Sequence, residues 1–307
     1  MNTPFHHITQ SKDYILSIGF HRLILFFVLL LVIFLTFYLS QVQFLEFKIS
    51  VYGNSNKRQS FTNQTDTLSQ SDKIVVISHA YENLDWLNLL DDEQIPYIVY
   101  TRSPNPLAHH RKLRINKGRD PAAYLRYIID HYSNLPLSVA FVHGHRTSYH
   151  QENPSDIVVT ALRALQWHKY NYMPLTIRLT HHTFKANSSD LQERVNYELW
   201  EDVLQKELGP PPELGIVTHC CATFAVKREA ILAHPAIFYS DILDYIMYTN
   251  YSDHYTSRSL EYTWHIIFGE STHICYKKCN VFLCDSKGNI TVPMTKKKSK
   301  ITYTIQE

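Results

Sequence analysis

The chain has 307 residues, of which 45% are hydrophobic and 19% are charged, a balance that indicates a folded protein rather than a disordered one. Its 30 basic and 28 acidic side chains give a formal net charge of +2, too small for a nucleic-acid-binding surface, so we expect no nucleic-acid partner. The sequence contains neither the dinucleotide-binding glycine motif nor a P-loop, which argues against both cofactor sites.

An uninterrupted apolar segment lies near the N-terminus. Leu23–Leu39 reads LILFFVLLLVIFLTFYL, and residues 23–45 contain no charged side chain. This length matches the roughly 20 apolar residues that cross a bilayer core, and the segment lacks the polar stripe of a buried core helix. A cleaved signal peptide would need a shorter apolar region and a small-residue cleavage site. We therefore predict an uncleaved transmembrane signal-anchor helix over 23–45, in contact with the lipid bilayer.

The position of the glycosylation sequons indicates the orientation of this helix. Lysine and arginine flank it on both sides, so the positive-inside rule does not decide. The sequons begin at Asn63, Asn187, Asn250 and Asn289, all after the helix. We therefore favour a single-pass type II protein of the Golgi or endoplasmic reticulum, with a cytosolic tail over 1–22 and a lumenal C-terminal domain. We expect a glycan at Asn63 at least.

The remainder of the chain divides into a spacer, one folded domain and a tail. Residues 46–72 are polar and lack periodicity, which is typical of a flexible stem. Short runs of β-branched residues then alternate with amphipathic segments over 73–285. This alternation predicts an α/β domain with a single mostly parallel sheet and flanking helices. Residues 286–307 form a basic C-terminal tail.

The individual elements can be placed from the same patterns. Buried strands are predicted over Lys73–Ser78, Ile95–Tyr100 and Ser138–Val142. A helix is predicted over Asp120–Tyr132, with Asp120 as its N-cap and Pro121 in the first helical position. Further helices are predicted over Ser155–Trp167, over Ser189–Leu208 with a Ser189/Gln192 capping box, over Lys227–Tyr248 with a break at Pro235, and over Ser257–Phe268.

The five cysteines suit an oxidising compartment. Cys220 and Cys221 are adjacent and cannot easily bond to each other without strain. We therefore expect one of them to pair with Cys275, Cys279 or Cys284, leaving an odd thiol. Buried free thiols are the alternative, and the spacing of the last three lies outside the common zinc patterns.

Short motifs follow one another in a fixed order along the predicted domain. They are Glu82-Asn-Leu-Asp-Trp-Leu87, Asn116-Lys-Gly-Arg-Asp120, Tyr124-Leu125, His131-Tyr-Ser-Asn-Leu-Pro136, Phe141-Val-His-Gly-His145, Cys221-Ala-Thr-Phe-Ala-Val226 and Glu261-Tyr-Thr-Trp-His-Ile-Ile-Phe-Gly269. In order and spacing they resemble the family known as domain of unknown function 3431. Asp120 stands where that family has Glu, and Tyr262 where it has Arg. This resemblance implies no particular activity.

The layout of the motifs also resembles nucleotide-sugar glycosyltransferases of the single-sheet GT-A type, a similarity at the level of the fold. In those enzymes a loop after the first strand binds the nucleoside, and a D-x-D motif ends a middle strand. The resemblance implies a nucleotide-sugar donor, a glycan or protein acceptor and a divalent metal such as Mn²⁺. Glu82, Asn83 and Asp85 occupy the nucleoside-binding loop; ordinary loop carboxylates are the alternative.

Two histidines stand in the D-x-D position. His143 and His145 follow a buried strand, where α/β sheets place their ligand crevice. Imidazoles suit Mn²⁺ or Zn²⁺ better than Mg²⁺, so we predict that these two residues bind the metal. They could instead hydrogen-bond phosphate directly, or be polar loop residues.

Charged residues at helix positions complete the predicted site. Glu261 and His265 are four residues apart and share a helix face. A carboxylate there could act as the general base of an inverting transfer, so we predict Glu261 and His265 as catalytic residues. An ordinary hydrogen-bonded helix pair is the alternative. Arg119 precedes a helix start and is predicted to contact phosphate, unless it forms a surface ion pair.

Three functions fit these features. The first is a membrane-anchored glycosyltransferase of the secretory pathway that transfers a sugar to a lumenal acceptor. The second is a non-catalytic lumenal or cell-surface binding protein that has kept the fold, which the missing D-x-D favours. The third is a metal-dependent hydrolase that uses the histidines, for which no recognised ligand spacing occurs.

Overall fold

The structure is a computed structural model that describes residues 27–36, 38, 71–92, 94–147, 157–176 and 178–293. The chain forms two units, Met1–Thr62 and Asn63–Glu307. In the first unit, residues 27–36 and 38 are helical, and their side chains are exposed. No helix in the described part of the chain is both long and apolar enough to cross a membrane. The rest of the predicted span over 23–45, the tail over 1–22, Asn63 and residues 294–307 lie outside the described residues.

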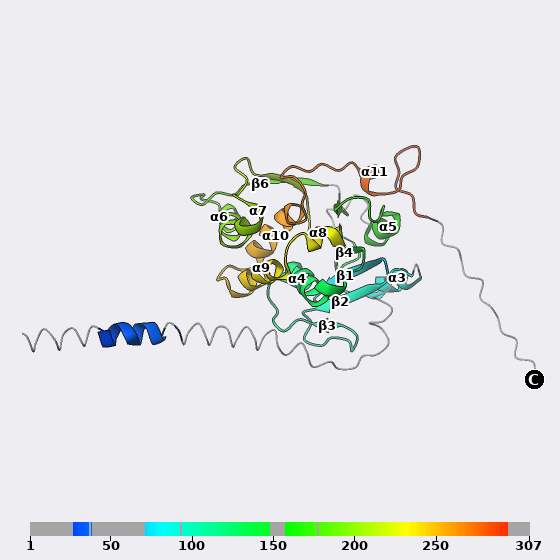
Figure 1. The fold of residues 1–307 in the computed structure, drawn as a ribbon. Helices are drawn as coiled ribbons and strands as arrows, with labels where there is room; N and C mark the ends of the chain where they lie inside the picture. The colour runs from blue at the N-terminus through cyan, green and yellow to red at the C-terminus, as the bar shows by residue number, and fades with distance from the viewer. Residues whose placement is uncertain are drawn as a thin grey trace, which may run out of the picture. The chain divides into compact units, whose positions relative to one another are not determined.

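The second unit is built around a six-stranded sheet with the order β3-β2-β1-β4-β8-β5 (Figure 1). Strands β3, β2, β1 and β4 run parallel to one another, whereas β8 is antiparallel to both β4 and β5. The strands are β1 Lys73–His79, β2 Tyr97–Thr101, β3 Arg111–Lys112, β4 Ser138–His143, β5 Tyr172–Pro174 and β8 Phe224–Lys227. The predicted α/β fold with a mostly parallel sheet is therefore confirmed.

Alternation of side chains along the strands produces a hydrophobic layer on each face of the sheet. Ile74 and Val76 of β1 pack in the layer that also contains buried residues of α4 (Arg119–His131), α9 (Ala236–Tyr248) and α10 (Asp253–Ile267). Val75 and Ile77 pack in the opposite layer, with buried residues of α5 (Ile157–Ala164). The sheet is therefore covered on both faces.

Smaller elements connect this framework. Strands β6 (Leu179–His182) and β7 (Ile216–His219) form a separate antiparallel pair. The helical elements that remain are η2 Asp85–Leu87, α3 Asn88–Asp92, η3 Tyr132–Asn134, α6 Leu191–Leu199, the π-helical η4 Trp200–Leu204, α7 Gln205–Leu208, α8 Arg228–Leu232 and α11 Lys278–Val281.

Most predicted helices are present, but two predicted caps are wrong. Helix α4 begins at Arg119, and its N-cap is Gly118 in the left-handed conformation, so Asp120 lies inside the helix. Helix α6 is capped by the Asp190 side chain, which accepts a hydrogen bond from the Gln192 N–H, instead of by Ser189. The predicted break at Pro235 is confirmed, because α8 ends before it and α9 begins after it.

The predicted cysteine pairing is also wrong. Cys220 bonds to its neighbour Cys221, Cys279 bonds to Cys284, and Cys275 is an exposed free thiol. The first pair lies in the tight turn between β7 and β8, where Cys221 has a φ of 85°. This left-handed backbone, which sequence spacing does not reveal, accompanies a bond between adjacent cysteines.

Candidate functional site

A cavity of about 450 Å³ lies beside the carboxyl end of β4. Open α/β sheets bind ligands outside the carboxyl ends of their strands where the strand order reverses, and here β2 and β4 lie on opposite sides of β1. The start of α4, the end of β4, the β6 segment, the turn after β7 and one face of α10 line the cavity. The lining residues are Arg119, Asp120, Pro121, His143, Arg178, Thr180, His182, Cys220, Cys221, Ala222, Ser257, Arg258, Glu261 and Tyr262.

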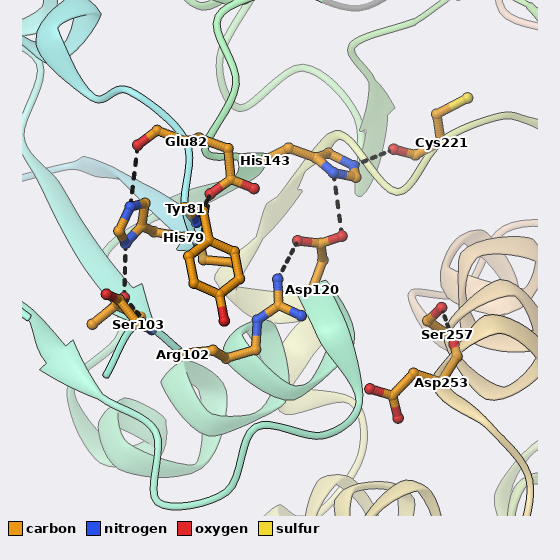
Figure 2. Close-up of polar contacts among 12 residues, drawn as sticks. His79, Tyr81, Glu82, Arg102, Ser103, Asp120, His143, Cys221, Asp253 and Ser257 are labelled. Carbon is orange, nitrogen blue, oxygen red and sulfur yellow. Dashed lines mark hydrogen bonds and ion pairs between the residues drawn. The ribbon is translucent and has the colours of Figure 1, made fainter. Parts of the chain in front are cut away.

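An ion pair forms one wall of the cavity (Figure 2). The Nδ1 atom of His143 lies 3.2 Å from Oδ2 of Asp120, and both side chains are less than one-fifth exposed. The Nε2 atom of His143 lies 2.7 Å from the Cys221 carbonyl oxygen. Arg102 lies 3.8 Å from the other Asp120 oxygen. An imidazole that donates from both nitrogens is protonated, so His143 is a fixed cation in this wall.

The pKa values of the pair agree with this geometry. Burial alone would lower the pKa of His143, but the charge and hydrogen bond of Asp120 outweigh it and raise that pKa to about 9. Burial would raise the pKa of Asp120, but the charge and hydrogen bond of His143 hold it well below its usual range. The pair is therefore charged throughout the physiological pH range.

This pair should make the stability of the protein fall as the pH rises above neutrality. The folded pKa of His143 exceeds the unfolded value of about 6.5, so its contribution is complete below pH 6.5 and is lost as the pH rises through 9. A shift of that size corresponds to roughly 3 kcal/mol. Urea unfolding between pH 6.5 and 9 should show a decline in the wild type that is absent in His143→Gln. Parallel declines in the two proteins would contradict the ion pair.

Glu261 faces the same cavity from α10. Burial raises the pKa of its carboxyl, while the charge of His143, a hydrogen bond from the Cys221 N–H and the charge of Arg258 oppose the rise. A carboxylate with a raised pKa in a cavity is a candidate proton acceptor. The predicted meeting of His143 and Glu261 in one site is therefore present in the structure.

Three arginines stand at the exposed edge of the cavity. Arg119 begins α4, Arg178 precedes β6 and Arg258 lies three residues before Glu261 on α10. All three are exposed. Among the described residues, none of these guanidinium groups lies within ion-pair distance of a carboxylate, in contrast to Arg126, which lies 2.5 Å from Asp130. The edge therefore presents cationic groups that are available to an anionic ligand.

The backbone around the cavity takes unusual conformations. Arg119, Cys221 and Ala222 have φ values of 47°, 85° and 45°. Residues other than glycine rarely adopt positive φ, and such residues cluster at functional sites. All three line the cavity, two of them in the disulfide turn.

The predicted nucleoside-binding residues do not line the cavity. Glu82 accepts hydrogen bonds from the Ala80 and Tyr81 N–H groups at 2.6 and 3.0 Å. Asn83 and Asp85 bond to each other at 2.9 and 2.6 Å. These side chains therefore shape the loop after β1. The loop does lie beside the end of β4, because the Trp86 indole N–H donates to the Gly144 carbonyl at 2.7 Å.

The two other predicted histidines have different surroundings. His145 packs beside His143 with ring centroids 4.9 Å apart, but it is not among the lining residues. His265 is completely buried, and burial lowers its pKa to about 4. It is not among the residues that line the cavity, so the structure does not bring it together with Glu261 in the candidate site.

The residues present do not fit the predicted metal. Both ring nitrogens of His143 already have hydrogen-bonding partners, and only one imidazole of the pair lines the cavity. No group of three or more His, Cys, Asp or Glu side chains in the described ranges is arranged to hold a metal ion. A Mn²⁺ site at His143 and His145 would require the ion pair between His143 and Asp120 to open.

The sequence prediction missed several lining residues. The sequence predicts Asp120 as a helix cap, although it directly follows Arg119, which is predicted to contact phosphate. Arg258 is three residues from Glu261 and therefore lies on the same helix face. This spacing is visible in the sequence and predicts that Arg258 lies near Glu261. Arg178 and the Cys220–Cys221 turn carry no local signal, because their place at the cavity depends on how β6 and β7 pair.

These features define an α/β domain with a cation-rimmed cavity at the carboxyl edge of its sheet. Residues 74–285 match the family described as "Protein of unknown function (DUF3431)", and the chain belongs to this family. Comparison with curated proteins and with solved structures finds no match.

Proposed function

We propose that this protein is a membrane-anchored glycosyltransferase of the secretory pathway, which transfers a sugar from a nucleotide-sugar donor to a lumenal glycan or protein acceptor. The observation that carries the proposal is the cavity, in which a carboxylate of raised pKa lies beside three exposed arginines that form no ion pair with a carboxylate in the described part of the chain. Such a rim suits a diphosphate, and such a carboxylate suits an acceptor hydroxyl.

The proposed reaction assigns one task to each group. Arg119, Arg178 and Arg258 bind the donor diphosphate. Glu261 accepts the proton of the acceptor hydroxyl as its oxygen forms a bond to the anomeric carbon. The bond between that carbon and the diphosphate oxygen breaks, and the leaving group takes both electrons. The rim arginines and the His143 cation stabilise the negative charge that develops on it.

The rim arginines should determine affinity for diphosphates. Charge-assisted hydrogen bonds contribute about 1.5–3 kcal/mol, so Arg258→Gln and Arg119→Gln should each weaken binding of uridine diphosphate and of inorganic pyrophosphate by roughly 10- to 100-fold. Isothermal titration calorimetry on the purified full chain measures this. Arg126→Gln is the matched control, because Arg126 pairs with Asp130 and does not line the cavity. Equal affinities for the four proteins would refute the anion site.

We propose that residues 23–45 anchor the protein as a type II membrane helix with the α/β domain in the lumen of the Golgi or endoplasmic reticulum. The charge-free apolar sequence supports this, and the sequons all follow it. The Cys220–Cys221 and Cys279–Cys284 disulfides also suit an oxidising compartment.

Protease protection tests the membrane topology. The full chain made in the presence of microsomes should resist added protease except for its short N-terminal tail. Glycosidase treatment should increase the electrophoretic mobility of the chain. The Asn63→Gln variant, which lacks one glycan, should show a smaller increase. Complete digestion of the domain in intact vesicles, together with an unchanged mobility, would show that the orientation is reversed.

A non-catalytic binding protein of the lumen or cell surface is the second candidate. The contacts of His143, which stands at the D-x-D position, favour this candidate. Its two ring nitrogens are already bonded to Asp120 and to the Cys221 carbonyl, so neither is free to bind a metal. This candidate predicts that a diphosphate or nucleotide sugar binds without turnover. Chromatography of a nucleotide sugar after prolonged incubation with the protein and mixed acceptors separates the two functions, since only a transferase releases the nucleotide.

A further inference from the structure

The Cys220–Cys221 disulfide occupies a central place in the cavity wall. Cys220 and Cys221 both line the cavity, and they join β7 to β8. The backbone of this turn contacts His143, whose charge the proposed chemistry uses. The Cys221 carbonyl lies 2.7 Å from Nε2 of His143, and Glu261 lines the same cavity.

The disulfide constrains these contacts directly. A bond between adjacent cysteines closes a small ring that contains the peptide bond between them. The carbonyl of that peptide belongs to Cys220 and accepts a hydrogen bond from the Thr176 hydroxyl at 2.6 Å. The Cys221 carbonyl follows this ring in the chain and accepts the hydrogen bond from His143. Its direction depends on the backbone at Cys221, where φ is 85°. This left-handed conformation is one that a residue with a side chain rarely adopts without a constraint.

We propose that the Cys220–Cys221 disulfide is the positioning element of the cavity: the ring that it closes fixes the backbone at Cys221, and the Cys221 carbonyl thereby orients the His143 imidazole. The inference deepens the proposed function, since it concerns the same cavity. In the reduced protein the turn is free to relax, and His143 loses the fixed partner of its Nε2 atom. We therefore expect the Cys221 carbonyl to hold His143 in place only when this disulfide is formed.

Other groups that face His143 leave its ring orientation only partly determined. Asp120 approaches Nδ1 from α4, Glu261 contributes its charge from α10, and His145 lies beside the ring from the same loop. None of these contacts Nε2, whose partner is the Cys221 carbonyl. The exchange rate of the Nε2–H proton therefore reports specifically on the hydrogen bond between His143 and the Cys221 carbonyl.

Exchange of this proton with solvent tests the proposal without any substrate. The purified full chain is labelled with ¹⁵N-histidine, and the Nε2–H resonance of His143 is assigned by its loss in His143→Gln. A hydrogen bond from a charged donor contributes roughly 10- to 100-fold in equilibrium terms, so its removal should speed exchange by at least about tenfold. Exchange is compared before and after treatment with a phosphine, which reduces the disulfide to two thiols and is oxidised to the phosphine oxide with oxygen from water.

A second disulfide supplies the matched control. The double variant Cys220→Ser with Cys221→Ser should show the same fast exchange as reduced wild type. The double variant Cys279→Ser with Cys284→Ser removes a disulfide that does not line the cavity, and it should exchange like the untreated protein. If the first variant fails to fold, phosphine-treated wild type with an unchanged circular dichroism spectrum provides the measurement.

The outcomes separate this inference from the proposed function. Fast exchange that follows loss of Cys220–Cys221 alone supports the inference, whether or not the protein transfers sugar. Unchanged exchange in folded protein without this disulfide overturns it, as does equally fast exchange in the Cys279–Cys284 control. Free thiols at Cys220 and Cys221, found by mass spectrometry in protein purified without reductant, also overturn it.

Discussion

Replacement of Glu261 by glutamine should reduce sugar transfer by about 10²–10⁴-fold while leaving the protein folded. Glutamine keeps the size of the side chain and an oxygen that can accept hydrogen bonds, but it cannot take a proton from an acceptor hydroxyl. General-base assistance of that size corresponds to about 3–5 kcal/mol of activation free energy. Affinity for uridine diphosphate should change little, because the rim arginines remain. Turnover, diphosphate affinity and melting temperature are measured on the same preparation.

The matched control for this variant is Glu201→Gln. Glu201 is an exposed carboxylate outside the cavity lining, so its replacement should leave all three measurements unchanged. Full turnover in well-folded Glu261→Gln protein would remove Glu261 from the mechanism. A lower melting temperature, with activity lost only in proportion to folded protein, would show that the residue is structural.

Replacement of Asp120 by asparagine should destabilise the folded domain by about 3 kcal/mol at neutral pH. Removal of one partner of a buried ion pair leaves the other charge uncompensated, which typically costs about 3–5 kcal/mol, and the partial exposure of this pair reduces that figure. His143 must then lose its proton or remain charged with a weaker partner. Urea unfolding at pH 7 gives the difference in free energy of unfolding.

Two further proteins make this result specific. Glu229→Gln disrupts an exposed pair with Arg228, in which Glu229 is 63% exposed, and it should change stability by less than about 1 kcal/mol. Combining Asp120→Asn with His143→Gln should restore part of the lost stability, because the unpaired charge disappears. A loss of stability as small as that of Glu229→Gln would show that Asp120 and His143 do not form a significant pair.

Local sequence patterns by themselves determined the class of the fold and part of the site. Runs such as Lys73–Ser78 and Ser138–Val142 are apolar and β-branched because both faces of a mostly parallel sheet are covered, and the structure has β1 and β4 there. Pro235 interrupts a helical pattern and separates α8 from α9. The positions of His143 at a strand end and Glu261 on a helix face followed from the same periodicities, and both line the cavity.

Only the tertiary structure decided which of these groups act together. Asp120 looks like a cap in the sequence, yet it pairs with His143 because the start of α4 lies beside the end of β4. Arg178 reaches the cavity through the pairing of β6 with β7, and Cys221 takes a positive φ in the turn that follows β7. Periodicity and propensity act over a few residues and specify elements. An ion pair or a cavity depends on the packing of elements that are distant in the chain, and no local pattern encodes that distance.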